Sequence, residues 1–80
     1  MTIGTAVQKR ILELCDEQKI TVNKLATISG ITQSTLNNIV SGRNNSTTVS
    51  TIQKICDGLK ITIDVFFDHD IFRNIEPEVY

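Results

Sequence analysis

The sequence predicts an all-α fold, a compact bundle of five short helices followed by a short C-terminal tail. Apolar residues recur at steps of three and four along almost the whole chain, which is the period of an amphipathic helix. No strand-like alternation persists beyond Ile61–Ile63, and the single proline, Pro77, lies in the tail. The 80 residues suit one small domain, since 40% of them are hydrophobic and 21% are charged. We expect the domain to span residues 1–69 and the tail to span residues 70–80.

The first helix is expected over residues 5–18, where one apolar stripe holds Val7, Ile11, Leu14 and Cys15. Thr21 then offers an N-cap, because a threonine hydroxyl can accept a hydrogen bond from a free N–H group of the first helical turn. The second helix, which Thr21 opens, has an expected inward face of Val22, Leu25, Ala26 and Ile28. Gly30 ends this helix in the left-handed conformation that glycine adopts without strain.

Three further threonines mark the starts of the remaining helices. Thr32 opens a third helix, which ends near Ser41 and is expected to bury Leu36, Ile39 and Val40. A polar loop over residues 42–47 leads to a fourth helix that starts near Thr48. The expected inward face of the fourth helix is Val49, Ile52, Ile55, Cys56 and Leu59. Thr62 opens a short fifth helix.

The second and third helices have the features of a helix-turn-helix, which joins two short helices by a tight turn that often contains glycine. Ala26 lies where the two helices are expected to cross, and only a small side chain lets the backbones approach there. Gly30 follows four residues later and makes the sharp turn. Any pair of antiparallel helices also needs such residues, so the spacing favours the DNA-binding motif and leaves a plain helical hairpin open.

The outward face of the third helix is uncharged. Once Leu36 and Ile39 are assigned to the core, the exposed positions are Gln33, Ser34, Thr35, Asn37 and Asn38. A merely solvated helix face usually carries Lys and Glu, which favour the helix more than Asn and Thr do. Gln and Asn can form paired hydrogen bonds with adenine, and Ser and Thr can contact other base edges. We interpret this face as a base-reading surface, with a merely polar face as the alternative.

Neighbouring residues can supply contacts with DNA phosphates. Thr21 and Thr32 begin helices whose free N–H groups can bind an anion, and Lys24 lies on the exposed side of the second helix. The loop after the third helix adds Arg43, Asn44, Asn45 and Ser46. The Asn-Asn-Ser stretch would serve equally well as a simple turn.

From about Lys9 to Phe67 the sequence resembles the phage-repressor and Cro-type helix-turn-helix regulators, the XRE family. The resemblance rests on KRILELCDEQKITVNKLATISGITQSTLNNIVSGR and then TIQKICDGLKITIDVFF. It implies a lambda-repressor-like bundle whose third helix enters the DNA major groove and reads bases with the exposed set above. It also implies phosphate contacts by Thr21, Asn23, Lys24 and the loop over residues 43–46, and a homodimer on a palindromic operator. Val22 departs from the family, which commonly has a Gln there, and the lack of Arg on the third helix points to A·T-rich sites.

Charge is distributed unevenly along the chain. The formal net charge is −1, but residues 1–60 carry seven bases and four acids, a net of +3, whereas residues 61–80 have a net of −4. No Asp or Glu occurs between Gln18 and Cys56. This gap is either chance in a chain with nine acids or a surface kept free of negative charge because it faces a polyanion.

All four aromatic residues lie near the C-terminus, which suggests self-association through the tail. The expected dimerisation residues are Phe72, Ile75, Val79 and Tyr80. The alternative is that Phe66 and Phe67 close the core while the rest of the tail is loosely ordered.

Cys15 and Cys56 are expected to be buried, reduced thiols. Asp68, His69 and Asp70 lack the ligand spacing of a metal site and are expected to form a solvated helix end.

The sequence therefore predicts a non-enzymatic, sequence-specific regulator of transcription, a repressor from a bacterium or its phage. It is expected to bind a double-stranded DNA operator in the cytoplasm, on the nucleoid. A hydrolase needs a nucleophile, a base and an orienting acid, and the one histidine lies in the acidic tail. No cofactor, metal, small-molecule ligand or membrane association is expected. The alternative is a protein-interaction module, such as an antitoxin or anti-repressor, that uses the same helical bundle to bind a partner.

Overall fold

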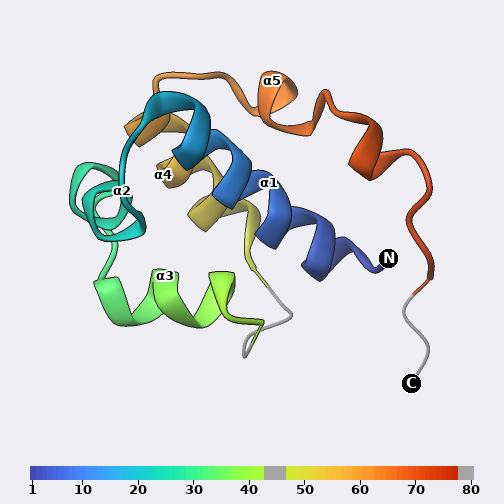
Figure 1. Cartoon of the computed structure of the whole chain (residues 1–80), viewed down its shortest axis with the longest axis horizontal. Helices are drawn as coiled ribbons and strands as arrows, with labels where there is room; N and C mark the ends of the chain where they lie inside the picture. The colour runs from blue at the N-terminus through green and yellow to red at the C-terminus, as the bar shows by residue number, and fades with distance from the viewer. Residues whose placement is uncertain (43–46, 78–80) are drawn as a thin grey trace.

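Five α-helices and a final 3-10 helix make up the part of the chain that this computed structural model describes, residues 1–42 and 47–77 (Figure 1). In chain order they are α1 Ile3–Gln18, α2 Val22–Ser29, α3 Gln33–Val40, α4 Val49–Leu59, α5 Ile63–Phe67 and the 3-10 helix η1 Asp70–Phe72. Residues 1–42 and 47–77 contain no strand. The predicted all-α, five-helix fold is thus confirmed. In the same two ranges, no helix combines the length and the apolar character needed to cross a lipid bilayer.

A threonine precedes every α-helix. Four threonine hydroxyls accept a hydrogen bond from the backbone N–H three residues later, namely those of Thr2, Thr21, Thr32 and Thr48. The last three were expected, whereas Thr2 starts α1 two residues earlier than the sequence predicted because the N–H of Thr5 donates to its hydroxyl. Thr62 has the same extended backbone but makes no capping bond. Its hydroxyl instead holds the pKa of the Asp64 carboxyl below the ordinary value through a hydrogen bond.

The core lies where α1, α2, α3 and α4 meet and is closed by α5. Its largest fully buried side chains are Phe66, Ile11, Leu25, Leu36, Ile55 and Cys56. Two expected core positions are wrong: Val49 is 70% exposed and Ile28 is 40% exposed. Val49 is the first residue of α4, a full turn before the first buried side chain of that helix. Ile28 lies beside the buried face of α2, which is formed by Leu25, Ala26 and Ser29.

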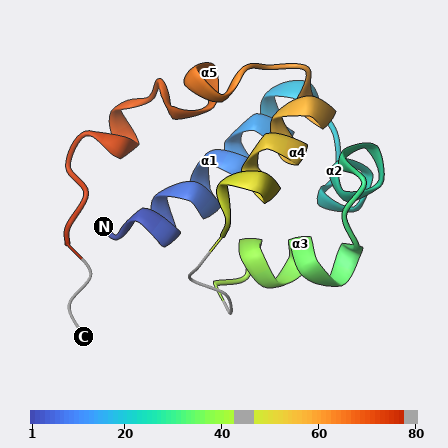
Figure 2. The same ribbon diagram turned by 180° about the vertical axis from the view of Figure 1, so that it is seen from behind.

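The helices α2 and α4 pack closely, and they lie next to each other in both views of the ribbon (Figures 1 and 2). Gly58 of α4 makes this approach possible. A Cβ atom at that position would lie 2.3 Å from Ser29 Oγ and 3.2 Å from Ser29 Cα. Real Cβ atoms essentially never come as close as 2.3 Å to another atom, so a side chain at residue 58 would force Ser29 or the helix crossing to shift.

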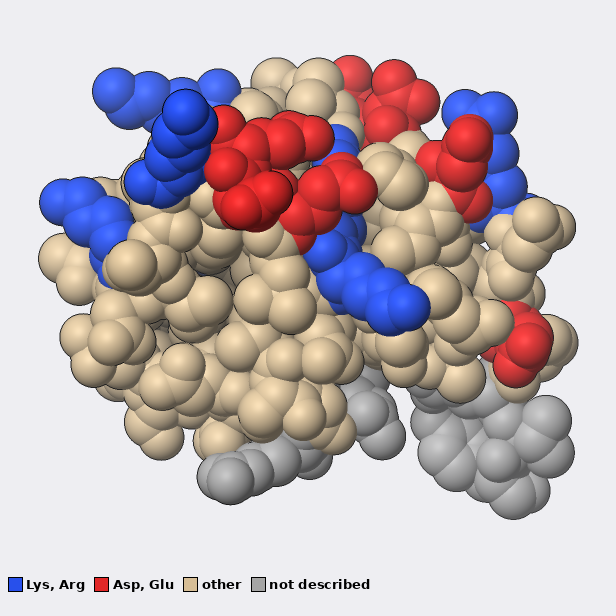
Figure 3. Space-filling view, in the orientation of Figure 1, with Lys and Arg blue, Asp and Glu red and all other residues tan. Residues whose placement is uncertain are grey.

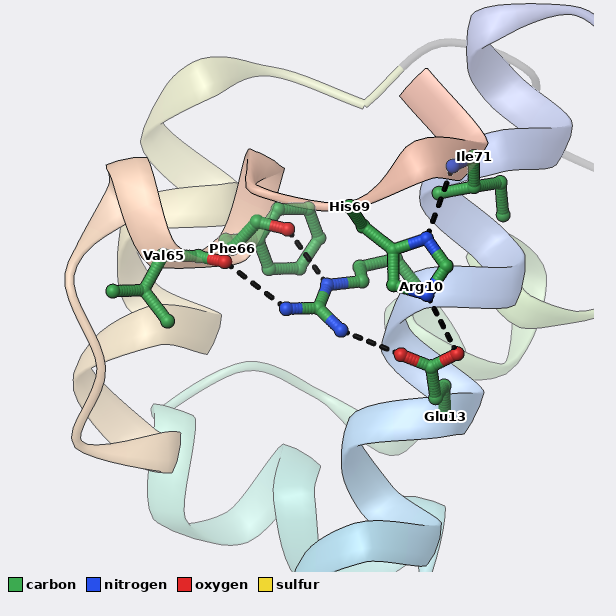
Figure 4. A network of polar contacts seen from close by, with 6 residues as sticks. All are labelled: Arg10, Glu13, Val65, Phe66, His69 and Ile71. Carbon is green, nitrogen blue, oxygen red and sulfur yellow. Dashed lines mark hydrogen bonds and ion pairs between the residues drawn. The ribbon is translucent and has the colours of Figure 1, made fainter. Parts of the chain in front are cut away.

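Helix α5 is tied to α1 through the buried side chain of Arg10, and the segment after α5 is tied to α1 through Glu13 (Figure 4). Its Nε donates to the carbonyl oxygen of Phe66 at 2.7 Å, and a terminal nitrogen donates to that of Val65 at 3.0 Å. Glu13 pairs with the other terminal nitrogen of Arg10, and its second oxygen lies 3.0 Å from His69 Nε2. The Nδ1 of His69 accepts the N–H of Ile71, so the histidine has protein partners on both nitrogens.

Residues 70–77 contact the helical body. The Phe72 ring lies 4.9 Å from that of Phe67 and 6.2 Å from that of Phe66, measured between centroids, and these three rings form one aromatic cluster. Further along, the N–H of Glu76 donates to the carbonyl oxygen of Met1 at 3.0 Å, and its carboxylate pairs with the terminal ammonium group. The described part of the tail therefore packs against α5 and the start of α1.

Candidate nucleic-acid interface

The turn between α2 and α3 is tight and is formed by three residues. Gly30 has φ +72° and ψ +27°, the left-handed conformation that the sequence predicted for it. The N–H of Ile31 donates to the carbonyl oxygen of Ala26 at 3.1 Å, which closes the end of α2. Thr32 then caps α3 through the N–H of Thr35. The two helices thus form the short helix-turn-helix that the spacing indicated.

Two buried side chains fix which face of α3 points outward. Leu36 is fully buried and Ile39 is 3% exposed, so both act as the anchors that the sequence predicted. The opposite face carries Gln33, Ser34, Thr35 and Asn37, and all four are exposed. Asn38 lies in the last turn, beside the bend at Ser41, and is half-buried, whereas it was expected to be exposed.

One of the exposed hydroxyls is oriented by the cap of its own helix. The Thr32 hydroxyl accepts the N–H of Thr35 at 3.1 Å and donates its proton to the Thr35 hydroxyl oxygen at 2.8 Å. Because the Thr35 hydroxyl oxygen accepts from Thr32, its own proton is free to point toward solvent, where it can donate to a ligand. A hydroxyl donor on the outer face can contact an acceptor on a base edge.

The residues expected to contact phosphates divide into two groups. Thr21, Asn23 and Lys24 lie exposed at the start of α2, and Thr32 lies exposed at the start of α3. The threonine caps engage only the N–H groups of Lys24 and Thr35, so the earlier N–H groups of each helix have no intrahelical acceptor. Such helix starts attract anions. The second group, Arg43, Asn44, Asn45 and Ser46, lies outside the residues that the structure describes.

The surface around α3 is electrically neutral. Residues 25–42 contain no charged side chain, and neither do residues 44–53. In the orientation of Figure 1, α3 runs along the lower edge, and Figure 3 shows neither acidic nor basic side chains over that part of this face. The acidic side chains visible there lie above it and toward the C-terminal segment. A polyanion that approached α3 from this side would therefore meet no negative charge over the helix itself.

The other singled-out residues have structural partners. Cys15 and Cys56 are buried free thiols, as expected, and burial raises the pKa of each. Asp68 and Asp70 are exposed and lie 3.9 Å and 3.3 Å from Arg73 nitrogens, whereas His69 contacts Glu13. Within residues 1–42 and 47–77, no group of three or more His, Cys, Asp or Glu side chains is placed to hold a metal ion.

Gln8 makes a contact that no sequence pattern predicted. Its side-chain amide donates a hydrogen bond of 2.6 Å to the carbonyl oxygen of Val40, the last residue of α3. The two residues are 32 positions apart in the chain. Helical periodicity gives no sign of a polar contact between distant helices, so no signal in the sequence could have identified it.

Comparison with known proteins identifies the family. The model of the Cro/C1-type HTH DNA-binding domain matches residues 10–70. Among solved structures, the chain is similar to the protein titled "Crystal structure of the prophage Lp1 protein 11", with 36% sequence identity and a TM-score of 0.82. That match covers 94% of this chain and 99% of the prophage chain. No curated protein matches the sequence. The chain belongs to the family of Cro/C1-type helix-turn-helix DNA-binding domains.

Proposed function

We propose that this protein is a sequence-specific repressor of transcription, in which α3 enters the major groove of double-stranded DNA and reads base edges. One observation carries the proposal: α3 buries Leu36 and Ile39 and turns only uncharged hydrogen-bonding side chains outward. Family membership supports a DNA-binding regulator and points away from an enzyme. A repressor needs only to occupy its operator, which suits a single small domain.

The base-reading set consists of Gln33, Ser34, Thr35, Asn37 and Asn38. Gln and Asn match the donor and acceptor pair on adenine, whereas the commonest contact with guanine uses Arg or Lys. Because α3 contains neither Arg nor Lys, its preferred operator is A·T-rich. Asn38 is half-buried and would contribute less than the four exposed side chains.

Phosphate contacts orient α3 on the duplex in this proposal. The N–H groups and side chains of Thr21, Asn23, Lys24 and Thr32 contact the DNA backbone in this proposal, and so do residues 43–46, which lie outside the described residues. These contacts carry no sequence information and set the register in which the base-reading side chains meet their base pairs. The neutral surface around α3 keeps acidic repulsion away from the same phosphates.

The protein acts as a homodimer on a palindromic operator in this proposal, and the C-terminal segment forms the dimer. Ile75 and Phe72 are half-buried on the helical body and keep part of their apolar surface available to a second copy. Val79 and Tyr80 complete the proposed set and lie outside the described residues. Two linked domains would bind far more tightly than one, because the second contact becomes intramolecular. Such a dimer would act in the cytoplasm, at the operator on the nucleoid.

The rival proposal, a protein-interaction module such as an antitoxin, would use exposed apolar side chains on α3. The exposed positions of α3 are polar, so nothing on this helix favours that proposal. Similarity to a prophage protein instead favours a phage-type regulator.

Selection of bound duplexes from a random DNA pool, repeated at two salt concentrations, tests the proposed function. We expect an A·T-rich palindrome, and we expect Gln33→Ala to weaken binding to it by about 1–3 kcal/mol, the value of one paired base contact. Gln53→Ala on α4 is the matched control, because Gln53 is exposed and bonds to Asp57 of its own helix. Equal binding to every sequence, unaltered by Gln33→Ala, would refute base reading.

A further inference from the structure

The C-terminal end of α3 is held by a residue of α1. Gln8 Nε2 donates to the carbonyl oxygen of Val40 over 2.6 Å. Within residues 1–42 and 47–77, this is the one hydrogen bond that joins α3 to another helix. The other contacts that hold α3 in place are apolar, through Leu36 and Ile39. Apolar contacts are non-directional, whereas a hydrogen bond fixes both a distance and a direction.

With the Gln8 contact, each of the last four carbonyl groups of α3 accepts a hydrogen bond. A helix leaves its last four carbonyl groups without intrahelical partners. The backbone N–H of Ser41 donates to Asn37, its hydroxyl donates to Asn38, and the N–H of Gly42 donates to Ile39. These donors lie next to the helix in the chain. The fourth carbonyl, that of Val40, receives its hydrogen bond from Gln8.

We infer that Gln8 is a positioning residue for DNA reading. A helix of 8 residues is marginally stable by itself, so its end frays unless tertiary contacts hold it. By tying Val40 to α1, Gln8 fixes the orientation of the outer face of α3 relative to the bundle. Base contacts need side chains placed to within a fraction of an ångström, and freedom at the end of α3 would weaken them. This inference rests on the proposed role of α3 as the base-reading helix.

A second glutamine of α1 makes the same kind of contact at another helix. Gln18 Nε2 donates to the carbonyl oxygen of Leu59 at 2.9 Å, and Leu59 is the last residue of α4. Donor type, parent helix and acceptor position are therefore identical. The capped helix differs, and α4 is not proposed to touch bases. Gln18→Leu is thus a matched control for Gln8→Leu.

The first test compares the two variants on DNA. Leucine is similar in size to glutamine but cannot donate a hydrogen bond. We expect Gln8→Leu to lower the ratio of affinities for the selected operator and for a scrambled duplex by about 3- to 10-fold, which is the net value of one hydrogen bond. Gln18→Leu should leave this ratio unchanged. Gln8→Glu, which places a carboxylate against the Val40 carbonyl, should lower the ratio at least as much as Gln8→Leu does. Fluorescence anisotropy titrations measure the affinities, and circular dichroism confirms that each variant is folded.

The second test needs no DNA. Hydrogen exchange of the Ser41 and Gly42 amides reports on the end of α3, since both donate to its carbonyl groups. We expect exchange there to be about 10-fold faster in Gln8→Leu and unaltered in Gln18→Leu. Unaltered exchange in Gln8→Leu, or an equal loss of discrimination in both leucine variants, would overturn the positioning role. If exchange is faster in Gln8→Leu but the wild-type protein binds all DNA sequences equally, the proposed base reading is refuted and the Gln8 contact still holds the end of α3.

Discussion

At the scale of single residues, Arg10 shows how this small domain accommodates a buried charge. Its side chain is 7–8% exposed, and its N–H groups meet two backbone carbonyl oxygens and the Glu13 carboxylate. The two carbonyl groups belong to the last turn of α5, so Arg10 caps that helix from α1 and neutralises its negative end. A buried guanidinium is stable only with such a full set of acceptors.

Replacing Arg10 by methionine should destabilise the fold, because the acceptors on α5 and Glu13 would lose their donor. We expect Arg10→Met to lower the free energy of unfolding by about 2–4 kcal/mol in urea denaturation. Arg73→Gln is the control, because the Arg73 side chain is 68% exposed and its ion pairs lie at the surface. That substitution should change stability by less than about 0.5 kcal/mol. If both variants lost the same free energy, the Arg10 network would not stabilise the fold.

The two cysteines should be unreactive in the folded protein. Cys56 is fully buried and Cys15 is 4% exposed, and desolvation raises the pKa of both thiols. The thiolate is the reactive form, so a disulfide reagent at pH 8 should modify them only at the rate of unfolding. Above about pH 9 the thiols of the unfolded chain ionise, whereas those of the folded protein, whose pKa is raised, stay neutral. The free energy of unfolding should therefore fall as the pH rises above about 9. Modification of the native protein at the rate of a free thiol would contradict the burial of both side chains.

At the scale of elements, the crossing of α2 and α4 depends on Gly58. Alanine favours a helix by about 1 kcal/mol over glycine, but its Cβ would strike Ser29. We expect Gly58→Ala to destabilise the protein by about 1–3 kcal/mol in thermal or urea unfolding. Ser29→Ala alone should be neutral or stabilising, since the buried Ser29 Oγ has no hydrogen-bond partner in the part of the chain that the structure describes. Ser29→Ala should also partly restore the stability of Gly58→Ala, because it removes the Oγ atom that the new Cβ would strike. If the free energies of the two substitutions simply added in the double variant, the clash with Ser29 would not be the cause of the loss.

The elements also show what local sequence can predict. Threonine caps at residues 21, 32 and 48 and the left-handed Gly30 depend on a few neighbouring residues, and each prediction was confirmed. The anchors of α3 follow from helical periodicity and were confirmed as well. Val49 and Ile28 obey the same periodicity but lie at a helix end and beside a buried stripe, where tertiary contacts decide burial. The amide contact made by Gln8 joins distant helices, so periodicity cannot predict it.

At the scale of the whole molecule, the total charge of −1 hides a separation of charge. Acidic residues are absent from 19–55, the stretch that holds α2, the turn and α3, and they concentrate after α4. Within residues 20–53 the only cations are Lys24 and Arg43. The proposed DNA surface is therefore free of repulsion but weakly attractive, so its affinity must come mainly from neutral hydrogen bonds and from dimerisation.

This distribution predicts a weak dependence of operator binding on salt. Each neutralised phosphate contributes about −0.9 to the slope of log K against log salt concentration, so two cations in each protomer give a slope of about −4 for a dimer. Lys24→Gln should reduce the slope by about 2 for the dimer, because one contact is lost in each protomer. Lys60→Asn is the control, since Lys60 ends α4 at the end farther from α3 along the chain, and Asn tolerates its left-handed φ of +60°. Anisotropy titrations at four salt concentrations give the slopes. A slope near −8, or an equal effect of Lys60→Asn, would mean that basic residues other than Lys24 and Arg43 contact the phosphates.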